Sequence, residues 1–91
     1  MHDHFKIIAD SNGFVLINTN GEYENHAHLK KSSTCHLLIK LISREIVPMS
    51  EYLRGSCLRL TLNEDYKETI LRKQAKDRER LAYFNANKGV R

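Results

Sequence analysis

The sequence predicts a single α+β domain over residues 1–91, in which a three-stranded antiparallel β-meander is followed by two or three α-helices. Two Asn-Gly pairs, Asn12-Gly13 and Asn20-Gly21, separate short segments rich in β-branched and aromatic residues. Beyond these pairs, apolar residues recur at helical spacing and polar N-cap residues divide the chain. We expect the meander over about residues 4–29 and helices over about residues 34–47, 50–60 and 63–86.

The three strands of the meander are predicted from the segments that flank the two Asn-Gly pairs. Asn-Gly tolerates the positive φ that tight hairpin turns require. The first pair therefore joins Phe5–Ala9 to Phe14–Asn18, and the second leads into Tyr23–His28. The apolar run Phe14–Ile17 is expected to form the central strand.

The first helix is predicted from a change of hydrophobic period after the polar segment 30–34, which ends in Thr34 as a potential N-cap. A broad apolar stripe follows, and Pro48 stops the helix. This stripe should cover one face of the sheet, with two of its members among the most buried residues. Its members are Cys35, Leu38, Ile42 and Ile46, of which Leu38 and Ile42 are expected to be deepest.

The second helix starts after Ser50, which together with Glu51 supplies a cap and an acidic residue for its first turn. An alternative is a strand over Cys57–Leu62, where leucines alternate with polar residues. The period does not decide between the two, and Gly55 weakens both. The cap and the acidic residue favour the helix.

The third helix is expected from Glu64 to about Asn85, capped by Asn63 and begun by the acidic pair Glu64 and Asp65. Asn87-Lys88-Gly89 supplies the stop signal. Apolar residues are present at both ends of this segment, and its middle is polar on nearly all sides.

Composition places the chain among ordinary globular proteins, with 41% hydrophobic and 29% charged residues. The longest uncharged apolar run, Gly13–Ile17, is too short for a membrane span, and the N-terminus lacks the pattern of a signal peptide. Two cysteines, Cys35 and Cys57, do not make a disulfide framework and are expected to be buried as small apolar residues. We therefore expect a cytoplasmic protein.

The basic middle of the last helix is the candidate binding site. The net charge of +4 permits an acidic partner without requiring one. At about 3.6 residues per turn, three basic residues fall on one face, and a lysine and a tyrosine lie beside them. The expected binding residues are Arg72, Lys76 and Arg80, with Lys73 and Tyr83.

Two interpretations of this helix stay open. It is either a solvated helix that carries charge pairs such as Asp77 with Arg80, or a basic stripe that docks on phosphates or on an acidic protein groove. A helix that is polar all round often meets a partner.

Histidines are the remaining candidates for chemistry. His26 and His28 lie two apart on a strand and point to one side, and His2 and His4 repeat this spacing. Together with Asp3 they could ligate zinc, but the first and third strands of a meander lie roughly 9–10 Å apart. We therefore expect no metal site. A general acid or base at His26 or His28 would still need a reacting partner.

No motif indicates a catalytic residue or a cofactor. A phosphate-binding glycine loop, paired zinc-binding cysteines and a nucleophile elbow are all missing from the sequence. The sequence therefore predicts a protein that is not an enzyme, with a small His-dependent enzyme as the least favoured possibility.

Two stretches, Ile17–His26 and Ser50–Arg54, together with the order of elements, resemble small proteins of phages and mobile elements, especially those of low-GC Gram-positive bacteria. The resemblance implies a compact accessory protein that binds and blocks or redirects a larger machine. Anti-CRISPR and other anti-defence inhibitors belong to this class, as do small DNA-binding regulators. It implies no particular functional residue.

The expected function is that of a non-enzymatic binding protein that inhibits or modulates a nucleic-acid-handling complex of the host. Its partner would be a protein or nucleoprotein with an acidic patch, which would accept the basic stripe. The alternative is direct binding of nucleic acid by the same helix. Against this alternative, Asp77 and Glu79 interrupt the stripe, and no aromatic platform for bases is evident on the sheet. No membrane partner is expected.

Overall fold

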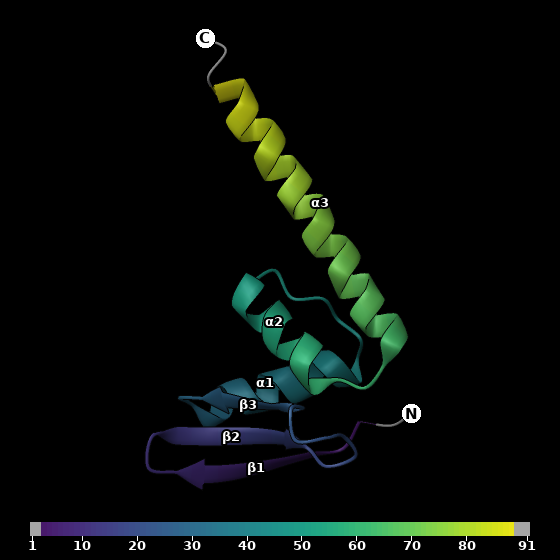
Figure 1. Cartoon of the computed structure of the whole chain (residues 1–91). Helices are drawn as coiled ribbons and strands as arrows, with labels where there is room; N and C mark the ends of the chain where they lie inside the picture. Colours follow the sequence, from purple (N-terminus) through teal and green to yellow (C-terminus); the bar gives the residue numbers. More distant parts are fainter. Residues whose placement is uncertain (1–2, 89–91) are drawn as a thin grey trace.

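The structure, a computed structural model, describes residues 3–88, with side chains for residues 3–83. Figure 1 shows a sheet at one end of the molecule, two helices against it, and a long helix that extends away from both. This arrangement confirms the predicted α+β meander followed by helices. The elements in order are β1 (Phe5–Asp10), β2 (Gly13–Asn18), β3 (His26–Leu29), α1 (Ser32–Ser43), α2 (Glu51–Leu60) and α3 (Glu64–Lys88).

The first hairpin forms where the sequence predicts it. β1 and β2 pair antiparallel, with Asp10 opposite Gly13, so Ser11 and Asn12 make the turn. Gly13 has a φ of 144°, and a Cβ atom there would lie 2.4 Å from the carbonyl oxygen of Leu29. Gly13 is therefore required both by its backbone angle and by the close approach of the end of β3.

The second connection is longer than a tight hairpin. β3 starts at His26, opposite Ile17, so the segment Tyr23–Asn25 belongs to the loop and not to the strand as predicted. The side chain of Asn25 holds this loop, because its Oδ1 accepts a hydrogen bond from the Glu22 N–H at 2.8 Å. Gly21 makes room for it, since a Cβ atom at this position would lie 2.6 Å from Asn25 Oδ1.

The core lies between the inner face of the sheet and the helices. Alternate residues of each strand point inward, and α1 contacts all three strands. Leu38 is 0% exposed and Ile42 is 3% exposed, as the stripe predicts, and Cys35 and Cys57 are buried free thiols. The fully buried apolar side chains also include Leu16, Leu60, Tyr66 and Ile70.

Helix α1 begins earlier and ends earlier than predicted. Its N-cap is Lys31, without a side-chain hydrogen bond, so the predicted cap Thr34 lies within the first turn. The helix ends at Ser43, four residues before the predicted end at residue 47. Glu45 takes a left-handed φ of 53°, and the backbone N–H of Ile46 bonds to the carbonyl of Leu41 at 2.9 Å. This Schellman-type end turns the chain well before Pro48 and leaves Ile46 outside the buried stripe.

Helices α2 and α3 follow the predicted caps. The Leu53 N–H bonds to Ser50 Oγ at 3.3 Å, and residues 57–60 continue the helix, so the alternative strand over Cys57–Leu62 is wrong. Helix α3 is described as far as Lys88, while the predicted stop at Gly89 lies outside the described residues. Among residues 3–88, none of the helices combines the length and apolar character needed to cross a bilayer.

A buried polar network joins the N-terminal segment to the sheet and to the α2–α3 junction. Asn18 is 1% exposed, and its Nδ2 donates to the Leu60 carbonyl at 2.7 Å and to Asp3 Oδ1 at 2.9 Å. Asp3 in turn accepts from the Leu62 N–H at 2.7 Å and from Thr61 Oγ1 at 2.6 Å. These bonds fix the C-terminal end of α2 against the central strand.

Stability is expected to fall at alkaline pH because of three buried acids. Burial raises the pKa of the Cys35 thiol above its ordinary 9.0. Burial raises the pKa of the Cys57 thiol above its ordinary 9.0, and burial raises the pKa of the Tyr66 hydroxyl above 10.0. The unfolded chain therefore loses these protons first, and the native state loses stability as pH rises through these ordinary values. Each group adds a slope of about 1.4 kcal/mol per pH unit.

Denaturant unfolding at pH 8, 9.5 and 10.5 measures this slope. Tyr66→Phe, which loses the hydroxyl bond to the Ile46 carbonyl, should be less stable at pH 8 but should show a shallower loss above pH 10. Equal slopes in the two proteins would contradict a titrating Tyr66.

Candidate functional site

Among residues 64–83 of α3, whose side chains the structure describes, those of the first turns enter the core. The backbone N–H of Tyr66 bonds to the capping Asn63 Oδ1 at 3.1 Å, and Tyr66 and Ile70 are buried. At the other apolar end of the helix, Leu81 is 62% exposed, and the side chain of Phe84 lies outside the described residues. All residues from Arg78 to Tyr83 are exposed, so α3 projects from the body in Figure 1.

An ion pair from α2 sets the orientation of the middle of α3. Arg54 is 6% exposed, and its Nη1 lies 2.6 Å from Oδ2 of Asp77. The hydrogen bond from Arg54 holds the pKa of Asp77 below its ordinary value. Within the described residues, Arg54 Nε is buried without a hydrogen-bond partner, so Asp77 is the main compensation for this buried charge. Asp77 therefore faces the body and neutralises Arg54.

An adjacent side of α3 carries the candidate binding face, which we define as Arg72, Lys76, Arg80 and Tyr83. All four side chains are exposed. Arg72 Nη2 donates to Glu68 Oε1 at 2.5 Å, which is an exposed pair one turn apart. Among residues 3–83, Lys76 and Arg80 have no ion-pair partner.

The structure separates Lys73 from this face. Lys73 lies on the side toward α2, with its Nζ 3.8 Å from Asp77 Oδ1. Asp77 thus pairs with Arg54 and Lys73, rather than with Arg80 as the interpretation of a solvated helix supposes. Glu79, two turns from Arg72, falls on the candidate binding face by its spacing and is the acidic residue that interrupts it.

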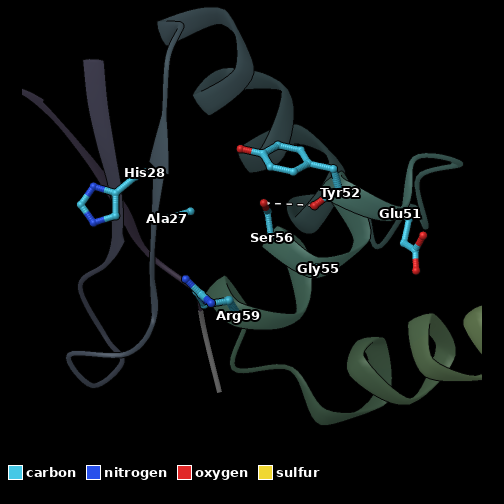
Figure 2. A pocket seen from close by; sticks show the side chains of 7 residues that line it. All are labelled: Ala27, His28, Glu51, Tyr52, Gly55, Ser56 and Arg59. Carbon is cyan, nitrogen blue, oxygen red and sulfur yellow. Dashed lines mark hydrogen bonds between the residues drawn. The ribbon is translucent and has the colours of Figure 1, made fainter. Parts of the chain in front are cut away.

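A groove lies between β3 and α2. Its volume is ≈ 410 Å³, and Figure 2 shows Tyr52 near one end, Arg59 near the other, and Gly55 and Ser56 between them. Arg59 extends from the last turn of α2 toward β3, whereas Glu51 points away from the groove. The β3 side is formed by Ala27 and His28.

The outer face of the sheet, which lies opposite the helices, gathers the two strand histidines. The His26 ring lies 5.2 Å from the Tyr23 ring and 5.0 Å from the His28 ring. Both histidines face the same side, as their spacing predicts. They border a shallow hollow of ≈ 210 Å³ whose floor includes Val15 and Ile17. His26 Nδ1 lies 2.7 Å from the Tyr23 carbonyl oxygen, which fixes this ring against the loop.

The strand order β1-β2-β3 keeps the N-terminal histidine His4 apart from His26 and His28. His4 Nδ1 lies 3.1 Å from Thr19 Oγ1, and Asp3 belongs to the buried network. Within residues 3–88, no three His, Cys, Asp or Glu residues are grouped so that they could hold a metal ion. His2, the remaining histidine of the zinc hypothesis, lies outside the described residues.

No family model, curated protein or solved structure matches this chain.

The groove between β3 and α2 is the feature that sequence reasoning missed. Gly55 was the available signal, because a glycine in the middle of a helix costs about 1 kcal/mol relative to alanine. A Cβ atom on Gly55 would have nothing within 4 Å, so packing within the chain does not require the glycine. The groove at Gly55 exists because β3 lies beside α2. The periodicity of residues 51–60 does not predict where β3 packs.

Proposed function

We propose that the protein is a non-enzymatic binding protein that presents the far part of α3 to an acidic surface of a larger nucleic-acid-handling complex in the cytoplasm. The observation that carries the proposal is the projection of α3 from the body with three basic side chains and Tyr83 on its outward face. Folding does not require this arrangement, because among residues 64–83 only the first turns of α3 enter the core.

Charge supports an acidic partner. Residues 72–80 contain five basic and two acidic side chains, and one of the acidic ones, Asp77, is turned inward by Arg54. Lys73 is turned the same way, so the outward side of residues 72–80 keeps four basic residues and one acidic residue. Such a face accelerates association with an acidic patch and contributes to specificity. Tyr83 and Leu81, both exposed, add an amphipathic and an apolar contact near the projecting end.

The proposed mode of action is inhibition or modulation of the larger complex, in line with the anti-CRISPR and anti-defence class that the sequence resembles. A projecting helix on a small rigid body can occupy a groove of the partner while the body blocks access to it. Direct binding of nucleic acid is the second candidate, because Asp77 no longer interrupts the stripe. Glu79 on the same face disfavours close phosphate contacts.

A triple substitution of the binding face tests the proposal. Replacing Arg72, Lys76 and Arg80 with Gln should change the free energy of unfolding by less than about 1 kcal/mol, because exposed charges are individually worth little. The same protein should bind its partner roughly tenfold or more weakly, with a smaller dependence on salt. The measurement combines thermal melting with quantitative capture from host lysate.

The matched control replaces three exposed lysines, which are Lys6 in β1, Lys31 at the N-cap of α1 and Lys40 in its last turn, and it changes the net charge equally. It should capture the same partner as the wild type. Nuclease treatment of the lysate separates a protein partner, which stays bound, from a nucleic acid, which is lost. Equal capture by the wild type and the α3 variant would show that the stripe is only a solvated face.

A further inference from the structure

The open edge of β3 has backbone groups without partners. β3 is the last strand of the order β1-β2-β3. The Asn18 N–H bonds to the Asn25 carbonyl at 3.0 Å, and the bonding of antiparallel pairs alternates from that point. The N–H and C=O groups of His26 and His28 therefore point away from β2. Within the described residues these groups have no backbone hydrogen bond, so they can pair with another extended chain.

Helix α2 stands beside this edge and forms the second wall of the groove. The hollow of ≈ 410 Å³ is bounded by Ala27 and His28 on one side and by Tyr52, Ser56 and Arg59 on the other. In Figure 2 the helix runs alongside β3, with Tyr52 and Arg59 reaching toward the strand from opposite ends. A strand edge that faces a helix across an open groove is the geometry by which a peptide is added to a sheet.

Gly55 keeps the groove open. It lies in the helical stretch Glu51–Leu60, where alanine would be a better helix former. Its missing side chain faces the groove, and a Cβ atom there would meet no atom of this chain within 4 Å. The glycine therefore leaves space for something that is not part of this chain.

The charges that line the groove favour a negatively charged ligand. Arg59 is exposed and reaches toward β3, and among residues 3–83 it has no ion-pair partner. The only acidic residue of the lining, Glu51, points away from the groove. A guanidinium that is not already paired favours a carboxylate, which it can bind with two parallel hydrogen bonds.

We propose that the groove between β3 and α2 binds an extended peptide that pairs with β3 as a fourth strand and places a carboxylate against Arg59. The backbone of the peptide bonds to His26 and His28, and its side chains pass over Gly55. The carboxylate is an acidic side chain or a free C-terminus. This surface is separate from the binding face of α3, so the two proposals fail or succeed independently.

A displayed library of random ten-residue peptides tests the proposal, in one format with a free C-terminus and in another with the C-terminus blocked. We expect selection on the wild-type protein to enrich acidic sequences. Enrichment in both formats would mean that Arg59 binds the side chain of an internal acidic residue. Enrichment only with a free C-terminus would mean that Arg59 binds the terminal carboxylate. A selected synthetic peptide should slow hydrogen exchange of the His26 and His28 amides. Perturbations confined to α3 or to the outer sheet face would overturn the proposal.

Two substitutions in the groove complete the test. Gly55→Leu fills the space between α2 and β3 and should weaken the selected peptide roughly tenfold or more, while thermal melting stays unchanged or rises. Gly55→Ala is the matched control, which should melt higher and retain most of the binding. Arg59→Gln should weaken acidic peptides several-fold, and Arg44→Gln, an exposed arginine away from the groove, should not.

Undiminished binding to Gly55→Leu, or a library without enrichment, would overturn the proposal. The other occupant of an open edge is a second copy of this chain. Sedimentation equilibrium without peptide detects such a dimer. If the dimer slows hydrogen exchange of the His28 amide and is lost in Gly55→Leu, then a second copy of the chain, and not a peptide, is the partner of β3.

Discussion

Ile42→Ala is expected to lower the free energy of unfolding by about 2–4 kcal/mol. Ile42 is 3% exposed and lies on the face of α1 that covers the sheet, one turn after Leu38. Truncation removes three carbon atoms from a closely packed interior and leaves a cavity that the rigid sheet cannot collapse to fill. For a chain of 91 residues, this is a large part of the total stability.

Denaturant unfolding of the purified variant measures this loss. Leu37→Ala is the matched control, because Leu37 is on the same helix but 42% exposed, and it should cost less than about 1 kcal/mol. If Ile42→Ala also cost less than about 1 kcal/mol, α1 would not be the helix that covers the core.

The elements that the sequence predicted well are those set by local chemistry. Ser50 and Asn63 cap α2 and α3 through their own side chains, and both caps are visible in the sequence. The first hairpin follows from Gly13, whose positive φ few other residues tolerate. The stripe with Leu38 and Ile42 correctly marked the helix that covers the sheet.

The deviations arise from contacts between distant parts of the chain. Asn20-Gly21 resembles the first turn, but Asn25 lengthens the second connection by bonding to the Arg59 carbonyl of α2 at 2.8 Å. The end of α1 depends on Glu45 in a left-handed conformation, which sequence patterns assign to Gly or Asn. The periodicity of α3 predicted which residues share a face. Which face turns outward is decided by Arg54, 23 residues away in the sequence from Asp77.

Helix α2 connects the two proposed surfaces. Gly55 and Arg59 face the groove beside β3, whereas Arg54 reaches the other way to Asp77 of α3. Any shift of α2 against the sheet would change both the width of the groove and the direction in which α3 projects. Substitutions that break the hydrogen bonds between α2 and the sheet therefore test whether the width of the groove and the direction of α3 change together.

Asn18→Ala is expected to lower the free energy of unfolding by about 2–4 kcal/mol, more than is usual for removing a polar side chain. The substitution removes the donor to the Leu60 carbonyl at 2.7 Å and to Asp3 at 2.9 Å. The site is 1% exposed, so the acceptors left behind are poorly hydrated and a cavity remains. Asn18→Asp should cost still more at neutral pH, since it brings a second carboxylate against Asp3.

The structural consequence should appear in α2. Hydrogen exchange is expected to accelerate in the last turn of α2, at Leu58 to Leu60. The amides around Leu38 in α1 should still exchange only through global unfolding of the variant. Asn12→Ala, in the exposed turn of the first hairpin, is the control and should change stability by less than about 1 kcal/mol. If Asn18→Ala lowered the free energy of unfolding by less than about 1 kcal/mol and left hydrogen exchange in α2 unchanged, packing alone would hold α2 against the sheet. The groove would then keep its width without the polar network.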